Sequence, residues 1–329
     1  MTEPRTIRWG ILGTGAIAGA FARALTETEG SVLHAVGSRT PESAAAFAAT
    51  HAAARAHGSY AQLAADPDVD AVYVATPHAF HLRDTLLALD AGKPALCEKA
   101  FALSAGQARR MVHAAAAHGL PLMEAMWTRF LPSTRFVLET IASGRLGEAR
   151  ALVADFGFRV PFDPASRLFD PALGGGALLD LGVYAVSLGH LLFGAPTAVG
   201  GTAALGATGV DESSTVALTH AGGRVTSALQ SFRVATPCRA SILCDGGSLV
   251  LHAPWWGASR VSVQPADGTP TTHDFPRPGE GYAPMAAAFA ELVRTGRLES
   301  DGMPLADTVA VMETMDALRA IYGVAYADA

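Results

Sequence analysis

The stretch IRWGILGTGAIAGAFARAL, residues 7–25, decides the fold of this chain. It begins with a short apolar run typical of a buried strand and ends with a helical pattern. Between them, Gly13, Gly15 and Ala18 complete the spacing GxGxxA. Gly13 permits a tight turn, Gly15 lets the backbone approach a pyrophosphate, and small Ala18 lets the helix pack on the strand. An ordinary glycine turn is the alternative, but the place between a strand and a helix favours dinucleotide binding.

The alternation of strand and helix continues through the first third of the chain. Further strands are predicted at residues 31–37, 70–77, 94–100 and 120–126, with helices at 41–50, 79–92 and 104–119. Strict alternation predicts a parallel sheet that is covered by helices on both faces. The fold class is therefore α/β, with an N-terminal Rossmann domain, a doubly wound parallel sheet, over residues 1–123.

The remainder of the chain has a different pattern. Strands are predicted at residues 149–158, 214–232 and within 239–263, with helices at 127–142, 284–295 and 304–322. The segment HAGGR, residues 220–224, joins two adjacent strands as a hairpin would. We expect residues 124–329 to form an α+β domain with a large, mostly antiparallel, open sheet for substrate binding and dimerisation.

Composition excludes several classes of protein. Half of the 329 residues are hydrophobic, 16% are charged, and the net charge is -6 without a long basic block. Disorder, nucleic-acid binding and binding to anionic membranes are therefore not expected. The polar start MTEPRTIRWG lacks a signal-peptide pattern, and three cysteines without CxxC spacing suggest free thiols. We expect a cytoplasmic protein without a metal site.

The residues after the second strand indicate which dinucleotide binds. An NAD site usually has an acid there, which accepts a hydrogen bond from the ribose 2'-hydroxyl. This chain has Ser38, Arg39 and Thr40 instead. A guanidinium with hydroxyls beside it suits a 2'-phosphate, so NADP is favoured over NAD, although Arg39 could also be a solvated surface residue.

Two further segments contain candidate catalytic groups. CEKA places Glu98 and Lys99 at the carboxyl end of a buried strand, the edge at which doubly wound sheets bind ligands. GGGALLDLGVYAVS, residues 174–187, places Asp180 and Tyr184 four residues apart in an otherwise apolar stretch. On a helix, residues with this spacing share a face.

These motifs together resemble one family. GTGAIA, ATPHAFHLRDTLLALDAGKPALCEKA and GGGALLDLGVY are similar to the glucose–fructose oxidoreductase/inositol dehydrogenase (Gfo/Idh/MocA) family, over nearly the whole chain. The nearest branch is that of the dimeric dihydrodiol dehydrogenases and NADP-dependent D-xylose 1-dehydrogenases. Two positions depart from the family pattern: Ala100 replaces the proline of EKP, and Ala18 replaces the third glycine of the fingerprint.

The resemblance implies a catalytic site formed by Lys99, Asp180 and Tyr184 around the nicotinamide. Oxidation of a hydroxyl requires a base for the proton, and a free tyrosine, with a pKa of about 10, is too weakly acidic for that role near neutrality. A nearby lysine cation lowers the pKa of a phenol. Many family members have histidine at position 184, so Tyr184 indicates the sugar and dihydrodiol branch. The alternatives are a buried aromatic residue for Tyr184 and a structural acid for Asp180.

The full set of candidates adds weaker ones to the residues named above, since His81, Arg129 and the aromatic residues could each be ordinary core. The predicted cofactor-binding residues are Gly13, Thr14, Gly15, Ala16, Ile17, Ser38, Arg39, Thr40, Thr76, Pro77, His78, His81, Glu98 and Lys99. The predicted substrate-binding residues are Trp127, Arg129, Phe156, Asp180, Tyr184, Trp255, Trp256 and Tyr282. Aromatic faces suit the C–H faces of a sugar ring or a flat diol.

The sequence thus predicts an NADP-dependent oxidoreductase that acts on a sugar or cyclic diol. Reduction of a keto-sugar or of 1,5-anhydrofructose by the same groups is an alternative, because the chemistry is reversible. A non-catalytic nucleotide sensor is an alternative of another class, although both Lys99 and Tyr184 are present. In the second domain strands outnumber helices, which leaves a sheet face free, and the family implies a homodimer through that face.

Overall fold

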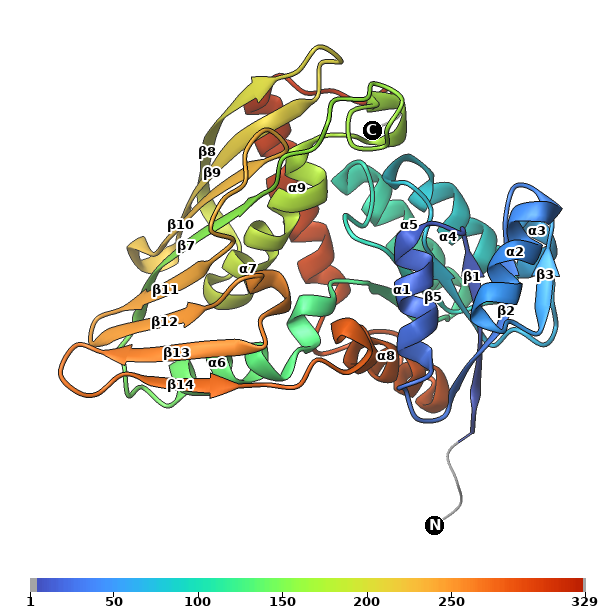
Figure 1. Ribbon diagram of the computed structural model, residues 1–329, viewed down its shortest axis with the longest axis horizontal. Helices are drawn as coiled ribbons and strands as arrows, with labels where there is room; N and C mark the ends of the chain where they lie inside the picture. Colours follow the sequence, from blue (N-terminus) through green and yellow to red (C-terminus); the bar gives the residue numbers. More distant parts are fainter. Residues whose placement is uncertain (1–4, 328–329) are drawn as a thin grey trace. The chain divides into compact units, whose positions relative to one another are not determined.

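The computed structural model describes residues 5–327, which form two compact units (Figure 1). Among the described residues, the first unit contains 5–102, 106–127 and 278–309, and the second contains 103–105, 128–277 and 310–327. The sequence-based boundary after residue 123 stays a prediction. A single boundary assigns residues 278–309 to the second domain, whereas they belong to the first unit in the structure.

The first unit is built on a parallel sheet of six strands. The strands are β1 (Ile7–Leu12), β2 (Ser31–Gly37), β3 (Arg55–His57), β4 (Ala71–Val74), β5 (Ala95–Cys97) and β6 (Leu122–Glu124). Their order is β3-β2-β1-β4-β5-β6, and every pair is parallel. This is the doubly wound order of dinucleotide-binding domains, so the predicted fold class is confirmed.

Helices cover this sheet, and one of them comes from residues 278–309 near the end of the chain. The covering helices are α1 (Ala16–Leu25), α2 (Pro41–His51), α3 (Tyr60–Ala64), α4 (His81–Asp90), α5 (Ala105–His118) and α8 (Ala283–Thr295). Trp9 of β1 packs between Phe21 of α1 and Phe289 of α8, with ring centroids 5.1 and 5.6 Å away. The apolar side of α8 completes this core, which is why residues 278–309 join the first unit.

The second unit contains a sheet of eight strands. These are β7 (Ala149–Gly157), β8 (Pro196–Leu205), β9 (Asp211–His220), β10 (Val225–Ser231), β11 (Ala240–Cys244), β12 (Gly247–Leu251), β13 (Arg260–Pro265) and β14 (Thr271–Asp274). Their order is β14-β13-β12-β11-β7-β10-β9-β8. Among the described residues only the central pair, β7 and β10, is parallel, so the sheet is mostly antiparallel as predicted.

Helices of this unit lie against one face of the sheet. They are α6 (Pro132–Ala142), α7 (Val183–Phe193) and the part of α9 (Leu305–Tyr322) that belongs to the unit (Figure 1). The predicted helix at 127–142 is interrupted, because Leu131 precedes Pro132 and is extended, with φ -67° and ψ 143°. The helical stretch Pro171–Phe193 is long and apolar enough to cross a membrane, but 89% of its most apolar window is buried in the structure. Burial of this kind is expected of a core helix.

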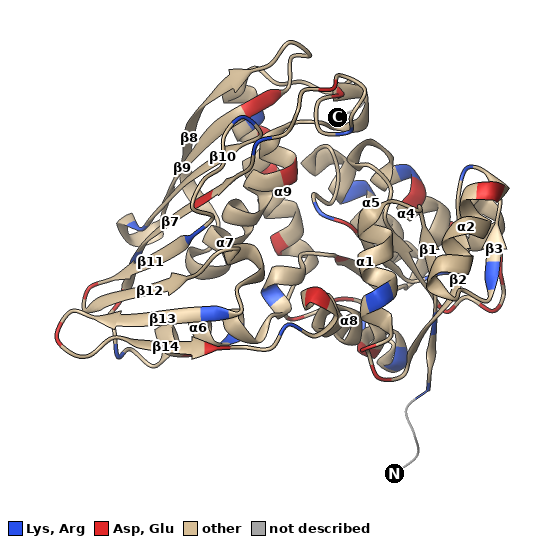
Figure 2. Cartoon of the chain, in the orientation of Figure 1, with Lys and Arg blue, Asp and Glu red and all other residues tan. Residues whose placement is uncertain are grey.

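The other face of the central strands is exposed and poor in charge. Burial alternates along β9 and β10, so every second side chain points outward. Val153 on β7 is 48% exposed, and Val225, Leu229 and Leu243 are exposed on neighbouring strands. Figure 2 shows that charged residues are sparse along most of these strands. The face is therefore a broad, largely uncharged surface.

Candidate active site

The start of α1 in the first unit has the geometry that an anion-binding site requires. Gly13 has φ +107°, and a Cβ there would lie 2.7 Å from the carbonyl oxygen of Ala75, so the turn requires glycine. A Cβ on Gly15 would meet no atom within 4 Å, which leaves open space in front of the helix. Gly15 is the N-cap and provides no side-chain cap, so the first N–H groups of α1 are available to a phosphate. These residues fit a dinucleotide, and their contact with the cofactor stays a prediction.

The end of β2 provides basic and hydroxyl side chains and no acid. Ser38 is buried, and Arg39 and Thr40 are exposed. The hydroxyl of Thr40 caps α2 by accepting a hydrogen bond from the N–H of Ser43 at 3.2 Å. The guanidinium of Arg39 is the charged group at this strand end, so the local chemistry suits a phosphate better than a ribose hydroxyl.

The segment after β4 supplies Thr76, Pro77 and His78. Thr76 is buried, and its hydroxyl has no hydrogen-bond partner within residues 5–327. An orphaned buried hydroxyl is costly unless a ligand satisfies it, so Thr76 fits a contact with the cofactor. His78 is buried as well and begins a short 3-10 turn that ends at Phe80.

His81 holds two loops of the first unit together. It is fully buried, and its ring nitrogens lie 2.9 Å from the carbonyl oxygen of Ala100 and 2.8 Å from that of Thr76. Burial lowers the pKa of His81, while these two carbonyls act in the opposite direction. Both nitrogens thus bind protein atoms, so His81 supports the loops that carry Thr76 and Lys99.

Glu98 and Lys99 follow β5 at the carboxyl edge of the sheet. Glu98 is buried, and its carboxylate accepts hydrogen bonds from the hydroxyl of Tyr73 and, at 3.2 Å, from the N–H of Lys99. Lys99 itself is half-buried, and the peptide bond from Lys99 to Ala100 is cis. Glu98 therefore orders the backbone on which Lys99 is placed.

Two aromatic candidates of the first unit contact each other. The rings of Trp127 and Tyr282 lie 4.7 Å apart at an angle of 31°. Trp127 is buried and Tyr282 is half-buried. The pair joins residues that are far apart in sequence, and a role in substrate binding stays a prediction.

In the second unit, three aromatic candidates, with Tyr184 among them, form a cluster. Tyr184 is 6% exposed, and its ring lies 5.7 Å from that of Phe156 on β7. Phe156 in turn stacks on Trp256, with centroids 3.4 Å apart and planes 10° apart. Trp255 points elsewhere and donates from its indole N–H to the carbonyl of Asp155 at 2.9 Å. The structure thus brings Phe156, Trp256 and Tyr184 together, with Trp255 as support.

Asp180 does not lie in an ordinary α-helical turn. Leu178–Gly182 is a π-helical turn, and α7 follows it directly from Val183. The sequence predicted the shared face of an α-helix, whereas π-helical bonding widens the turn that separates Asp180 from Tyr184. The Asp180 carboxylate accepts a hydrogen bond from Arg167 at 3.1 Å. Sequence reasoning missed Arg167, which no motif marks.

Arg129 is buried and bound to α7. Its guanidinium donates to the hydroxyl of Ser187 at 3.0 Å and to the carbonyl of Ser187 at 3.2 Å. Ser187 lies three residues after Tyr184 on the same helix. Arg129 therefore helps to fix this helix, and the predicted contact with substrate stays a prediction.

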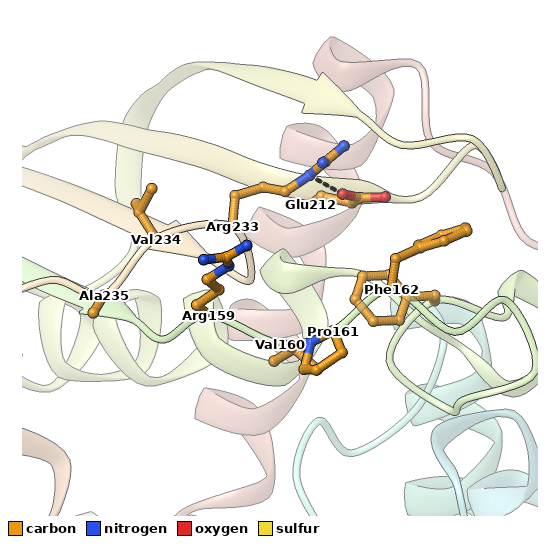
Figure 3. A pocket seen from close by; sticks show the side chains of 9 residues that line it. Arg159, Val160, Pro161, Phe162, Glu212, Arg233, Val234 and Ala235 are labelled. Carbon is orange, nitrogen blue, oxygen red and sulfur yellow. Dashed lines mark ion pairs between the residues drawn. The ribbon is translucent and has the colours of Figure 1, made fainter.

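A separate pocket of about 680 Å³ opens at the carboxyl ends of β7 and β10. Figure 3 shows Arg159 and Arg233 on one side and Phe162 on the other. Arg233 forms an ion pair with the buried Glu212. None of the predicted substrate-binding residues lines this pocket.

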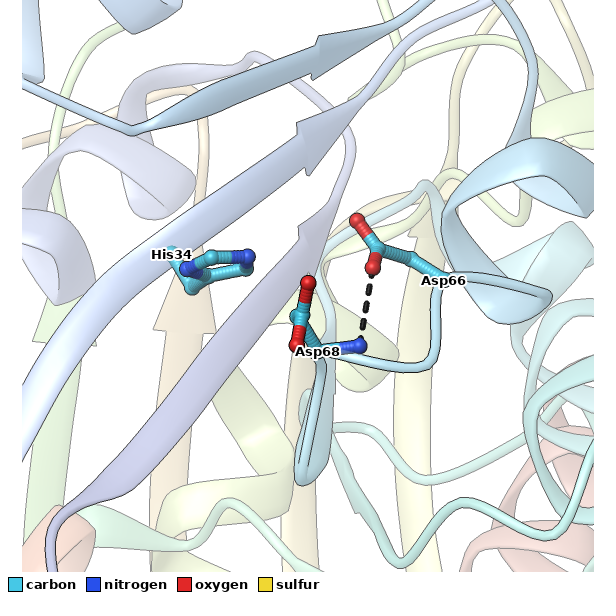
Figure 4. Close-up of side chains that lie close together, drawn as sticks. All are labelled: His34, Asp66 and Asp68. Atoms are coloured by element: carbon cyan, nitrogen blue, oxygen red, sulfur yellow. Dashed lines mark hydrogen bonds between the residues drawn. The ribbon is translucent and has the colours of Figure 1, made fainter.

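His34, Asp66 and Asp68 form a cluster whose ligand atoms lie within 4.8 Å of one another (Figure 4). Both carboxylates already bind arginine: Asp66 accepts from Arg55 at 2.7 Å, and Asp68 accepts from Arg8 at 2.7 Å. The cluster is therefore a network of ion pairs beside β2 and β3 rather than a vacant set of metal ligands.

The comparisons with known proteins agree with this geometry. Residues 7–126 match the oxidoreductase family with an NAD-binding Rossmann fold, and residues 134–250 match the GFO/IDH/MocA C-terminal domain. The chain therefore belongs to the Gfo/Idh/MocA family and is an oxidoreductase, and the resemblance found in the sequence is confirmed.

Particular relatives cover nearly the whole chain. D-xylose 1-dehydrogenase (NADP(+)) of Hypocrea jecorina is 33% identical over 98% of this chain and 94% of its own length. Human trans-1,2-dihydrobenzene-1,2-diol dehydrogenase is 34% identical over 97% of this chain and 98% of its own. The structure of a 3-ketoreductase from Actinomadura kijaniata with NADP and TDP-benzene superposes with a TM-score of 0.87, at 26% identity over 97% and 98% of the two chains.

Proposed function

We propose that this protein transfers hydride between NADP and a hydroxyl-bearing carbon of a sugar or cyclic diol, with Tyr184 as the acid/base. The observation that carries the proposal is the position of Tyr184, which is buried next to the stacked rings of Phe156 and Trp256. A phenol beside two flat aromatic faces suits a ring substrate that presents C–H groups to those faces and a hydroxyl to the phenol.

The proposed reaction needs no reactant other than the substrate and the nicotinamide cofactor. When bound, the nicotinamide supplies hydride exchange with the substrate carbon. In the oxidative direction the hydroxyl proton passes to the Tyr184 phenolate while the hydrogen on the same carbon leaves as hydride. The alcohol thereby becomes a carbonyl. In the reductive direction Tyr184 returns the proton to the carbonyl oxygen. Lys99 acts as the cation that favours the phenolate, and Asp180, held by Arg167, orients substrate hydroxyls.

The preference for NADP rests on the end of β2. Arg39 and the hydroxyls of Ser38 and Thr40 are the side chains that follow this strand, and no acid stands among them. A guanidinium binds phosphate through charge-assisted hydrogen bonds, whereas it cannot accept one from a ribose hydroxyl. The relative from Hypocrea jecorina is named as an NADP(+) enzyme, which supports the same choice.

We also propose that two copies associate through the exposed face of the eight-stranded sheet. Val153, Val225, Leu229 and Leu243 point outward from adjacent strands, and small residues lie between them. A broad apolar face of this kind is typically buried between subunits.

The test combines a substrate panel with two variants. Aldoses, keto-sugars and cyclic diols are assayed with NADP(H) and NAD(H) at the nicotinamide absorbance. Tyr184→Phe should lower kcat on the order of 10²–10⁴-fold with little effect on the affinity for NADP, because it removes the proton carrier and keeps the ring. Tyr322→Phe is the matched control, since it removes a buried hydroxyl that binds the carbonyl of Thr215 at 2.6 Å.

The outcome separates a catalytic role from a structural one. Lys99→Met should lower kcat and move the pH optimum of oxidation upward, because the phenolate loses its cation. A folded Tyr184→Phe protein that keeps more than about a tenth of kcat, in a reaction limited by chemistry, contradicts the assignment. No turnover with any member of the panel would favour a nucleotide-binding sensor instead.

A further inference from the structure

Asp211 is a buried acid that the proposed reaction does not use. It is the first residue of β9 and is 0% exposed. One carboxylate oxygen, Oδ2, accepts hydrogen bonds from the N–H of Leu178 and from the hydroxyl of Ser214, both at 2.7 Å. Within residues 5–327 no cation forms an ion pair with it. A buried carboxylate that only neutral donors stabilise is costly, which calls for an explanation.

The position of the other carboxylate oxygen of Asp211 explains why residue 176 of the GGG motif must be glycine. Oδ1 has no hydrogen-bond partner in the described part of the chain, and a Cβ on Gly176 would lie 2.5 Å from it. Gly176 has φ +123°, which side chains other than glycine rarely adopt. The hydroxyl of Tyr326, which donates to the carbonyl of Gly175 at 2.5 Å, lies 3.2 Å from the same Cβ position. The glycine turn is thus shaped around Asp211.

Asp211 binds the start of the turn that carries the candidate catalytic groups. Leu178 is the first residue of the π-helical turn, Asp180 lies two residues further, and α7 with Tyr184 follows directly. A negative charge at a helix N-terminus is stabilised by the free N–H groups and by the helix dipole. π-helical bonding is rare, so the turn needs an external anchor. Without the anchor the turn can tighten, which rotates Asp180 relative to Tyr184.

The charge of this anchor changes in mildly acidic solution. Burial raises the pKa of Asp211 to about 6, against the opposing effect of the Ser214 and Leu178 donors. Burial and the charge of Asp211 both raise the pKa of Tyr322 and of Tyr326. Both phenols therefore stay protonated and neutral between about pH 5 and 7, whereas Asp211 changes its charge in this range. The titratable groups around it are Tyr322, Tyr326, Arg319 over the ring of Tyr326, Glu212 with Arg233, and Asp180 with Arg167.

We propose that ionised Asp211 is a positioning residue, which fixes the π-helical turn so that Asp180 and Tyr184 face the substrate, and that its protonation releases them. The inference rests on the proposed function, because it assigns Tyr184 the role of acid/base. It predicts an acid limb in the activity that belongs to Asp211 and to no group that touches substrate.

The test uses Asp211→Asn, which keeps the shape of the side chain and cannot ionise. We expect kcat at pH 7.5 to fall more than tenfold, the KM for NADP to stay unchanged, and the acid limb near pH 6 to disappear. Ser214→Ala keeps the carboxylate but removes a donor that stabilises its charge, so the acid limb should move to higher pH. Amide hydrogen exchange of Leu178–Gly182 should be faster in Asp211→Asn than in the unmodified protein.

Some outcomes would overturn the inference. If Asp211→Asn keeps kcat within twofold and retains the same acid limb, Asp211 does not position the turn. An acid limb that does not move in Ser214→Ala, or unchanged amide exchange in Asp211→Asn, contradicts it as well. The Tyr184→Phe variant separates this failure from that of the proposed function. An active Tyr184→Phe protein refutes the acid/base assignment, whereas an inactive one together with a normal Asp211→Asn protein refutes only the positioning role.

Discussion

Replacement of Asp211 by asparagine should make stability and activity move in opposite directions. Burial raises the pKa of Asp211 from 3.8 to about 6, so the folded state binds the proton more tightly than the unfolded state does. The stabilising effect of that proton is complete below about pH 3.8 and is lost as the pH rises through 6. At neutral pH the ionised carboxylate therefore lowers the free energy of unfolding, and asparagine removes that cost.

The magnitude follows from the difference between the two pKa values. A difference of about 2.2 units, at about 1.36 kcal/mol per unit, corresponds to roughly 3 kcal/mol at pH 8. About half of this, roughly 1.4 kcal/mol, is lost between pH 5 and 8, and the rest is lost at lower pH. The amide also changes local hydrogen bonds, but that effect does not depend on pH. The pH dependence of the difference between the two proteins thus isolates the titration of Asp211.

Urea unfolding of both proteins at several pH values between 5 and 8 measures this difference. The free energy of unfolding of Asp211→Asn minus that of the unmodified protein should increase with pH by roughly 1.4 kcal/mol. Asp68→Asn is a control, because Asp68 is paired with arginines and its pKa is lowered. A difference that is flat over this range, or that falls with pH, would refute the reasoning. It would mean that the folded protein does not hold the pKa of Asp211 above its ordinary value, so that the carboxylate is already ionised throughout this range.

Other expected outcomes concern the cofactor, the substrate and assembly. Arg39→Asp should lower kcat/KM for NADP by more than tenfold relative to NAD, and a preference of the unmodified protein for NAD would contradict the assignment. Trp256→Ala removes the ring stacked on Phe156 and should raise the substrate KM severalfold while leaving the KM for NADP unchanged. Light scattering should give twice the chain mass of 33.9 kDa, and Val153→Arg on the exposed sheet face should restore the monomer mass. A monomer mass for the unmodified protein at micromolar concentration would exclude the dimer.

The first unit could be predicted almost completely, because its signals are local. Each predicted strand contains an observed one, and the glycine fingerprint lies at the start of α1 as expected. Strand β3 and helix α3 were missed, since Arg55–His57 and Tyr60–Ala64 are too short to show a period. Helix α8 was predicted, but its membership of the first unit depends on the contact between Trp9 and Phe289. These two residues lie far apart in the sequence, so no local pattern predicts their contact.

The second unit was harder to predict because its patterns are weaker. Strand β8 consists mainly of small residues, is mostly exposed along both sides, and so shows no alternation of apolar and polar positions. The cluster of Phe156, Trp256 and Tyr184 was predicted only as separate candidates. Its members come from a strand, a 3-10 turn and a helix, and only the folded chain brings them together.

The glycines that precede Asp180 show why a motif can be recognised without being understood. Glycines in such a position permit another group to approach the backbone closely. In the structure the second unit itself requires two of them: a Cβ on Gly175 would lie 2.8 Å from the carbonyl of Leu168, and one on Gly176 would lie 2.5 Å from Asp211. Asp211 lies 33 residues after Leu178, so no residue near the motif predicts that Asp211 binds it. The segment that contains Asp180 and Tyr184 therefore includes glycines that the fold of this segment requires. Gly176→Ala should reproduce the loss of activity of Asp211→Asn, although it replaces no titratable group. Normal kcat in a folded Gly176→Ala protein would show that the turn tolerates displacement of this carboxylate.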